Sequence, residues 1–363
     1  MAPAVKVLRM SNNLTTEVAA SFLGVSSARV RKLVQEGRIP AEKRGRDYSI
    51  RQDDLDAYQL YGRKPRGRPP MAEMPSERVR ESPPPYRASG QVKMEVGRGE
   101  IFQGDTIEVL RGLPERSFQL IIADPPYFQV LVGESWDNAW QSPGDYLDWT
   151  LRWVRECRRV LAPDGLLYVF GQLGKREHIW LHACSMLAKE MQFHDMIIWD
   201  RAVGYNERYD SFTPQYEMVL ALRHEANSKP YFNKDAVRLP YDEDTIETYL
   251  KDKRYKDRGA RERHLRKGKY ATNILRVPSL KGASKEKIGH PSQKPIALIE
   301  HLIASSSERG DHVLDPFLGS GTTAAACDQL GRTWVGVERD AGYCALAAKR
   351  VEALLVNPEL SLA

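Results

Sequence analysis

The spacing of apolar residues changes repeatedly along residues 93–357, and each change marks a predicted strand or helix. Short apolar runs, typical of strands buried on both faces, occupy residues 101–105, 120–123, 166–170, 196–199, 217–222, 313–315 and 333–337. Apolar residues at helical spacing occupy residues 106–113, 143–161 and 179–187, and Pro163-Asp164-Gly165 is expected to end the second of these helices. Strands alternating with helices predict an α/β fold with a doubly wound, Rossmann-like sheet.

Residues 12–61 show helical spacing on a smaller scale and predict a separate domain. Thr15 or Thr16 is placed to cap a helix whose inward face would carry Val18, Ala19, Phe22 and Leu23. After Gly24, Ser26 or Ser27 is placed to cap a second helix with Val30, Leu33 and Val34 inward. Two short capped helices joined at a glycine are typical of a helix-turn-helix.

Basic residues in this small domain favour DNA as its partner. The outer faces of the second predicted helix carry Arg29, Arg31 and Lys32, and the basic segment 43–46 is expected to belong to a small wing. The whole unit resembles the winged helix-turn-helix of the excisionase and MerR type. The alternative interpretation is a helical hairpin that contacts another protein.

Between the two predicted domains, residues 62–92 are rich in Pro, Arg and Ser, which is typical of a linker. Within it, Arg66-Gly67-Arg68-Pro69 resembles the core of an AT-hook, in which Arg66 and Arg68 would lie in a narrow minor groove. The alternative is a basic, soluble tether.

The composition describes a soluble globular protein of more than one domain. The chain has 363 residues, of which 42% are hydrophobic and 28% charged, and no apolar run approaches the ~20 residues of a membrane span. The apolar patch around Val5, Val7 and Leu8 is too short for the apolar region of a signal peptide, so we expect a cytoplasmic, nucleoid-associated bacterial protein with no membrane partner. The four cysteines lack metal-ligand spacing, which predicts reduced thiols and no metal site.

Positive charge is concentrated in residues 251–269. This segment holds ten Lys or Arg against three acids, a balance of +7, whereas the whole chain carries +6. A charge run is usually a solvated face, but tyrosines are interleaved here within an insertion of the sheet domain, and we favour contact with DNA phosphates. The predicted contacts are Lys253, Arg254, Arg258, Arg261, Arg263, Arg266 and Lys267.

Asp124-Pro125-Pro126-Tyr127 follows the predicted strand 120–123 and is the first candidate for chemistry. Two prolines cannot continue a strand, so a carboxylate, a rigid carbonyl and an aromatic ring gather at its carboxyl end. A nucleobase amine is a poor nucleophile, and hydrogen-bond acceptors such as Asp124 and the Pro125 carbonyl can localise its lone pair. Tyr127 offers a face on which an extruded base could stack. The alternative is a plain turn with Tyr127 in the core.

A second candidate site lies late in the chain. Residues 313–323 predict a strand, a glycine-rich turn and the start of a helix, whose free N–H groups suit a ligand. The strand that follows ends at Glu338, about twenty residues beyond the turn, where an acid suits the hydroxyls of a ribose. The two candidates together predict a nucleotide-like cofactor beside an amine-handling group.

Four motifs in this order resemble the beta-type amino-methyltransferases of bacterial restriction–modification systems. They are Asp124-Pro-Pro-Tyr, His290-Pro-Ser-Gln-Lys-Pro, Asp315-Pro-Phe-Leu-Gly-Ser-Gly-Thr-Thr and Glu338. In that family the catalytic motif precedes the S-adenosylmethionine motif, as it does here. The resemblance covers residues 95–355, and the segment from Tyr231 to Pro295 most resembles the RsrI adenine methyltransferase.

The resemblance implies a role for each matching position. The methionine part of S-adenosylmethionine would be held by Asp315, Phe317, Gly319, Ser320, Gly321 and Thr322. Glu338 would hold its ribose, and Asp105 would face its adenine. Gln293 and Lys294 would open a helix near the methionine carboxylate, and Asp124 would bridge cofactor and target amine. Residues 224–275 would form the target-recognition segment.

The implied function is methylation of adenine N6 in duplex DNA by base flipping, with Asp124, Pro125, Pro126 and Tyr127 as catalytic residues. Cytosine N4 is the alternative target, although that target more often goes with Ser in place of Asp124. Phe128 stands where the family often has Asn, which leaves the target pocket open. The pattern would also fit a DNA-binding regulator on a catalytically silent fold, or a protein or RNA methyltransferase. The resemblance further suggests a cognate restriction endonuclease and a homodimer.

Overall fold

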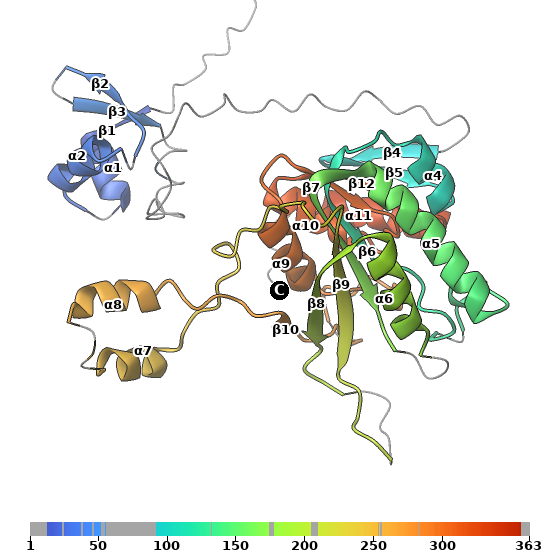
Figure 1. Ribbon diagram of the computed structural model, residues 1–363. Coiled ribbons are helices and arrows are strands. Elements are labelled where there is room, and N and C mark those ends of the chain that lie inside the picture. The colour runs from blue at the N-terminus through green and yellow to red at the C-terminus, as the bar shows by residue number, and fades with distance from the viewer. Residues whose placement is uncertain are drawn as a thin grey trace, which may run out of the picture. The chain divides into compact units, whose positions relative to one another are not determined.

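The computed structural model describes residues 13–356, except 24, 38, 46, 52–54, 56–91, 132, 174–177, 205–209, 253, 255 and 283. The chain divides into two compact units, Met1–Glu81 and Ser82–Ala363, each drawn in Figure 1. The AT-hook-like residues Arg66 and Arg68 lie outside the described residues, as does Lys253. The proposed linker 62–92 and the domain bounds around it therefore stay predictions.

The N-terminal unit has the helix-turn-helix and wing that its pattern predicts. Helices α1 (Thr16–Leu23) and α2 (Ser27–Gln35) pack beside a sheet of β1 (Asn13–Thr15), β3 (Asp47–Arg51) and β2 (Glu42–Arg44), in that order. Ser26 caps α2, because its side chain accepts a hydrogen bond from the Arg29 N–H. The hairpin of β2 and β3 forms the wing.

The buried face of α1 differs from the prediction. Val18 is 49% exposed and Phe22 41%, whereas Ala19 and Ala20 are buried. Thr16 anchors the start of the helix by donating a hydrogen bond to Asp47 in β3. The small alanine side chains belong to the apolar core of this unit, and the larger Val18 and Phe22 lie at the surface.

The larger unit is built on a mixed sheet. Its strands are β4 (Val92–Val96), β5 (Gly99–Gln103), β6 (Phe118–Ala123), β7 (Leu161–Gly171), β8 (Gln192–Asp200), β9 (Tyr216–Arg223), β10 (Ile274–Arg276), β11 (His312–Asp315) and β12 (Thr333–Glu338). They lie in the order β10-β8-β9-β7-β6-β11-β12-β5-β4. β4 and β9 are antiparallel to their neighbours, and the other pairs are parallel. The predicted doubly wound α/β class is confirmed.

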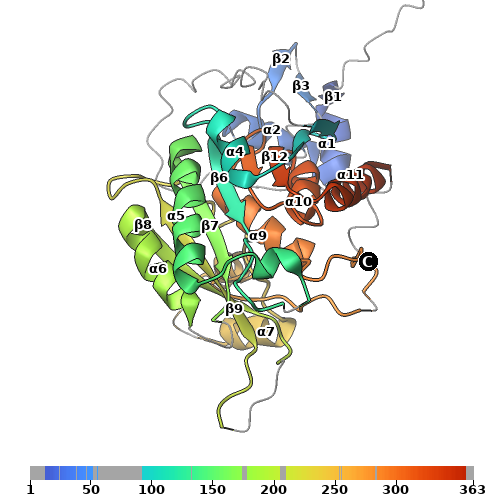
Figure 2. The same ribbon diagram turned by 90° about the vertical axis from the view of Figure 1, so that its right-hand side faces the viewer.

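Helices cover both faces of this sheet (Figures 1 and 2). One apolar core joins one face to α4 (Thr106–Gly112), α5 (Pro143–Val160) and α6 (Ile179–Glu190). Another core joins the opposite face to α9 (Ile296–Ser306), α10 (Thr322–Leu330) and α11 (Ala341–Val356). The strands read as continuous apolar runs because both faces are covered.

α5 ends at Val160, one residue from its predicted end, but the strand after it was predicted too short: β7 begins at Leu161, which pairs with Phe118, and so contains Pro163-Asp164-Gly165. The predicted start of α9 was wrong. α9 begins at Ile296, after Gln293 and Lys294, with Pro295 at its N-cap position. Both residues therefore lie in the loop that leads into the helix.

The insertion between β9 and β10 contains two short helices that the sequence pattern did not reveal. They are α7 (Glu243–Leu250) and α8 (Arg258–Leu265), and they pack against each other. Arg266 ties the pair together by ion pairs with Glu243 and Glu262. No helix among the described residues is long and apolar enough to cross a membrane.

The chain reverses its winding direction between β6 and β11. These two strands are neighbours in the sheet and parallel, although about 190 residues separate them in the chain. Chain connections lead from β6 to β7 on one side and from β11 to β12 on the other. Such a switch point opens a crevice at the carboxyl ends of the strands, which is where Asp124 and Asp315 lie.

Candidate active site

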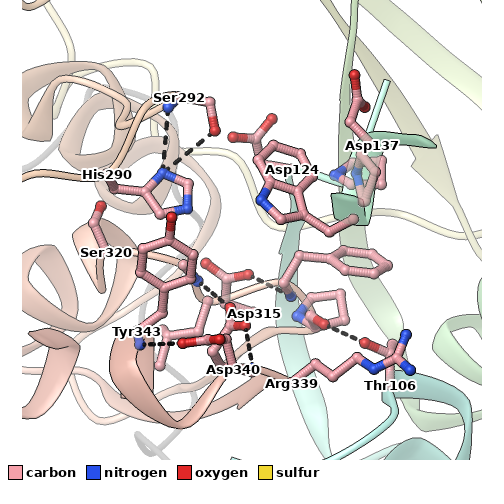
Figure 3. A pocket seen from close by; sticks show the side chains of 18 of the residues that line it. Thr106, Asp124, Asp137, His290, Ser292, Asp315, Ser320, Arg339, Asp340 and Tyr343 are labelled. Carbon is pink, nitrogen blue, oxygen red and sulfur yellow. Dashed lines mark hydrogen bonds between the residues drawn. The ribbon is translucent and has the colours of Figure 1, made fainter. Parts of the chain in front are cut away.

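A pocket of about 890 Å³ opens at this switch point (Figure 3). Its lining includes Asp124, Pro125, Pro126 and Tyr127 from the end of β6. Asp315, Phe317, Gly319, Ser320, Thr322 and Glu338 line it from β11, the glycine turn and β12, and Asp105, Gln293 and Lys294 complete the set. The structure thus brings the four sequence motifs to one cavity, and the role of each residue in it stays a prediction.

Two glycines with positive φ form the turn that precedes α10. Gly319 and Gly321 both have positive φ, +50° and +73°. A Cβ on Gly321 would lie 2.8 Å from the Cβ of Ala347 in α11. No side chain caps α10, which starts just after Gly321, and Thr322 and Thr323 of its first turn line the pocket.

Glu338 is tied to this turn. Its carboxylate accepts hydrogen bonds from the Gly319 N–H at 2.8 Å and from the Asp340 N–H at 2.9 Å. Each oxygen has a further lone pair, so the group can still accept a hydroxyl. Burial raises the pKa of the Glu338 carboxyl above its usual value.

Asp315 ends β11 in a buried position. Its carboxylate accepts a hydrogen bond from the Phe317 N–H at 2.9 Å. Burial, and then the nearby charges of Asp124 and Glu338, raise the pKa of Asp315 to about 7, although hydrogen bonds oppose the shift. A bound cation would favour the ionised form of this group.

Two other predicted cofactor residues serve the local fold as well. Asp105 caps α4 by accepting hydrogen bonds from the Ile107 and Glu108 N–H groups, and its side chain is exposed at the pocket. The ring of Phe317 packs edge-on against Trp153, with centroids 5.1 Å apart. Both residues line the cavity, and each also contacts a helix: Asp105 caps α4, and Phe317 packs against Trp153 of α5.

Thr322 and Ser320 are held by a residue that the sequence pattern did not single out. Arg350 of α11 is buried, and it donates a hydrogen bond of 2.8 Å to Thr322 Oγ1 while forming an ion pair of 3.1 Å with Glu286. Glu286 also accepts from the Ile296 N–H at the start of α9. An arginine at a core position of α11 was the available sequence signal.

Asp124 belongs to a buried cluster of charged groups. Its Oδ2 lies 2.7 Å from the Lys294 Nζ, and its Oδ1 accepts a hydrogen bond of 2.6 Å from the Tyr127 hydroxyl. Glu217 of β9 lies 3.4 Å from the same Lys294 Nζ. The Lys294 ammonium therefore pairs with two carboxylates of the protein, and its predicted place near the methionine carboxylate of the cofactor stays a prediction.

Tyr127 is oriented by the same cluster. Its hydroxyl faces Asp124 and Glu217 and accepts from Lys294 at 3.1 Å. Burial, followed by the charges of Asp124 and Glu217, raises the pKa of the phenol well above its usual value, so it remains a donor. The ring lines the pocket, and its hydroxyl end points into the cluster.

The loop after Tyr127 depends on Asp137, which the sequence analysis missed. This buried carboxylate accepts three backbone hydrogen bonds, from Tyr127 at 2.6 Å, Val130 at 2.7 Å and Leu131 at 2.6 Å. Phe128 and Gln129 between them both have positive φ. No sequence signal distinguished this aspartate from a surface residue.

Gln293 and His290 shape the opposite loop. The Gln293 side chain accepts from the Ile288 N–H and donates to the Glu286 carbonyl, so it closes the loop onto itself. The His290 ring packs against Tyr343 with centroids 4.5 Å apart, beside the glycine turn, as Figure 3 shows. Burial, and then the charge of Lys294, lower the pKa of His290 to about 4, which keeps this side chain neutral.

The predicted DNA-contacting cations differ in how they are held. In the N-terminal unit, Arg29 and Lys32 are exposed and Arg31 is half-buried near Asp47. In the α7–α8 region, Arg254 pairs with Asp252, while Arg261 lies over the ring of Tyr249. The exposed cations on α8 and just beyond it are Arg258, Arg263, Arg266 and Lys267.

Two family models match the chain. A DNA methylase family model, which covers N6 and N4 enzymes, matches residues 118–349, more than half of the chain. The chain belongs to this family. A helix-turn-helix domain model matches residues 14–60. Within the described residues, no three His, Cys, Asp or Glu side chains gather as a metal site would require.

Curated relatives are type II DNA methyltransferases. The chain is 31% identical to M.HpaI of Haemophilus parainfluenzae over 255 residues, which cover 68% of this chain and 72% of that protein. It is 30% identical to M1.MboII of Moraxella bovis, over 67% of this chain and 93% of the relative. The protein is therefore a site-specific DNA methyltransferase of the restriction–modification type.

A solved structure shares the fold. The PvuII cytosine-N4 DNA methyltransferase superposes with a TM-score of 0.50 at 18% identity, covering 73% of this chain and 93% of that one. S-adenosylmethionine is the methyl donor of the family. The pocket fits this cofactor, because it offers Gly319 for close approach, the start of α10 and the acids Asp315 and Glu338.

Proposed function

We propose that this DNA methyltransferase modifies the N6 amine of adenine. The observation that carries the proposal is the Asp124 carboxylate, which ends β6 at the pocket and is held on both oxygens, by Lys294 and by Tyr127. The aspartate supports adenine, because cytosine-N4 enzymes more often have serine at this place in the motif.

The proposed chemistry needs two acceptors for one amine. Asp124 accepts a hydrogen bond from one N–H of the target, and the carbonyl of Pro125 accepts from the other. Both hydrogen bonds favour the form of the amine whose lone pair is localised on nitrogen, which makes that nitrogen a better nucleophile. Since Asp124 and Pro125 are fixed before the substrate arrives, little reorganisation is needed during reaction.

S-adenosylmethionine, when bound, supplies an electrophilic methyl group on a sulfonium. We assign its amino acid part to Asp315, Phe317, Gly319, Ser320, Gly321 and Thr322, and its ribose to Glu338. Asp105 would face the adenine, and Gln293 holds the loop that closes this side of the pocket. The target base has to leave the duplex to reach Asp124, and Tyr127 and Pro126 line the space it would enter.

DNA binding is assigned to two surfaces. One surface carries the exposed cations of α8 and its flanks, in the insertion 224–275, which would contact DNA phosphates. The other is the helix-turn-helix, which would contact DNA through Arg29 and Lys32. A cognate endonuclease and a homodimer stay predictions of the family resemblance.

The test separates target from mechanism. DNA from a host that expresses the protein is read by native modification-sensitive sequencing, and N6-methyladenine at a single sequence is the expected result. N4-methylcytosine instead would refute the adenine assignment. In vitro, Asp124→Asn should keep DNA affinity within a few-fold while single-turnover methylation falls by about a hundredfold or more. A parent-like rate would contradict the role of Asp124.

A further inference from the structure

A row of alternating charges extends from Asp124 across the edge of the sheet. Asp124 meets Lys294 at 2.7 Å, Lys294 meets Glu217 at 3.4 Å, and Glu217 Oε1 meets Arg201 at 3.0 Å. The four residues come from the end of β6, the loop before α9, the start of β9 and the end of β8. The two carboxylates and two cations balance, so the row is neutral as a whole.

The two central members of the row are buried. The side chains of Lys294 and Glu217 are each 7% exposed, whereas those of Asp124 and Arg201 are each 22% exposed. The rings of Tyr127, Phe170 and Trp199 surround the ammonium, with centroids 5.1, 5.3 and 5.9 Å from its Nζ. A buried ammonium in such a shell is stable only if carboxylates compensate for its lost hydration.

We propose that Glu217 is a positioning residue for methyl transfer, which holds Lys294 and Tyr127 against Asp124 and so keeps that carboxylate oriented. The inference rests on the proposed role of Asp124. Glu217 reaches both partners with a single oxygen, Oε2, at 3.4 Å from Lys294 Nζ and 3.1 Å from the Tyr127 hydroxyl. Its other oxygen is held by Arg201, so the carboxylate cannot rotate freely.

Glu217 stands out in its strand. β9 is otherwise buried and apolar along its middle, and Glu217 is 5% exposed. It pairs with Trp199 across the antiparallel ladder with β8. A buried glutamate at this place would destabilise the sheet without its partners, and its partners are the groups that contact Asp124.

The arrangement has a charge consequence that a structural role alone lacks. Burial lowers the pKa of Lys294, but Asp124 and Glu217 more than offset this, and the pKa lies above its usual value. Other titratable groups nearby are Tyr127, Arg201, His290 and, beside Asp124, Asp315; His290 is neutral above about pH 4, and Asp315 has a pKa of about 7. Removing the charge of Glu217 lowers the pKa of Lys294, whereas removing that of Arg201 raises it further.

The experiment measures single-turnover methylation at saturating DNA and cofactor, from about pH 7 to about pH 9.5, for full-length variants. Glu217→Gln should lose at least about tenfold in rate near neutral pH and gain an alkaline decline that the parent lacks. Arg201→Gln should gain no such decline. In the double variant, the decline should shift back toward the parent, because Lys294 and Asp124 then form a neutral pair.

Controls separate this inference from the proposed function. Glu156→Gln, in the partly buried ion pair with Arg159 on α5, makes the same chemical change outside the pocket lining and should behave as the parent. Asp124→Ala is measured in parallel. Inactive Asp124→Ala beside a parent-like Glu217→Gln would overturn the positioning role alone, while active Asp124→Ala would overturn the proposed function.

Two further outcomes also decide the matter. Equal losses in Glu217→Gln and Arg201→Gln at every pH would assign both residues to the fold and overturn the inference. If Glu217→Gln does not fold, as judged by thermal unfolding, Arg201→Gln and the double variant still carry the test. An alkaline decline in the rate of Arg201→Gln would overturn the inference. It would also be overturned if the rate of the double variant did not decline at a lower pH than that of Arg201→Gln.

Discussion

The loop that follows the catalytic motif should depend on one carboxylate. Asp137 accepts backbone hydrogen bonds from Tyr127, Val130 and Leu131, all between 2.6 and 2.7 Å. Asp137 therefore holds the backbone of Tyr127, the residue whose hydroxyl contacts Asp124. Asp137→Asn keeps the size of the side chain but replaces one acceptor oxygen with a donor, so the structure predicts a defined loss.

The magnitude follows from the geometry. Tyr127 donates to one oxygen, and Val130 and Leu131 donate to the other. The single oxygen of the asparagine can accept from Val130 and Leu131 at most, which leaves the Tyr127 N–H facing an amide NH₂. Loss of one charged hydrogen bond and of the charge on the others should cost about 3 kcal/mol, and Asp137→Ala about 5 kcal/mol.

Two measurements check this prediction. At about 2 °C per kcal/mol for a unit of this size, the melting temperature should fall by about 6 °C in Asp137→Asn and about 10 °C in Asp137→Ala. Single-turnover methylation should fall by at least about tenfold in both, because Tyr127 loses its anchor. Asp148→Asn on the exposed side of α5 is the matched control. Parent-like stability and rate in Asp137→Asn would refute the reasoning.

Three other predictions follow from the pocket and the DNA-binding surfaces. Gly321→Ala should weaken cofactor binding in calorimetry and cost about 1–3 kcal/mol of stability, because φ is +73° and the new Cβ would clash with Ala347. Gly133→Ala, which has open space around it, is the control and should change neither quantity. Because burial raises the pKa of Asp315 to about 7, the folded state holds a proton that the unfolded state has released. The unliganded protein should therefore lose stability as the pH rises from about 4 to about 7. Cofactor affinity should rise through about pH 7, because the Asp315 carboxylate then forms. A stability that does not change with pH in the parent, or a pH dependence that is unchanged in Asp315→Asn, would contradict this. Arg258→Ala and Arg263→Ala should each lower the salt dependence of DNA binding by about one unit of slope, and deleting residues 1–81 should lower it further without changing the rate at saturating DNA; a collapse of that rate would place the N-terminal unit in the active site.

The sequence by itself determined the elements and the motifs. Apolar runs long enough for one buried strand predicted β6, β9, β11 and β12, because strands covered on both faces exclude most polar residues. Capping residues and glycine breaks predicted the helix-turn-helix, and the order of the motifs predicted a methyltransferase. Helix caps, glycine breaks and apolar periods are read within a few residues, and the motifs are read from their order along the chain, so neither needs the positions of the elements in space.

Only the tertiary structure decided which groups meet. Glu217, Asp137, Arg350 and Glu286 carry no motif, and their partners lie from 6 to about 90 residues away in the chain. The same holds for Lys294, whose ion pair with Asp124 no sequence pattern indicated, while its predicted place near the methionine carboxylate stays a prediction. A buried charge needs a partner of opposite sign, but the chain pattern does not say which one. That choice follows from the sheet order, which sets β6, β9 and the loop before α9 around one pocket.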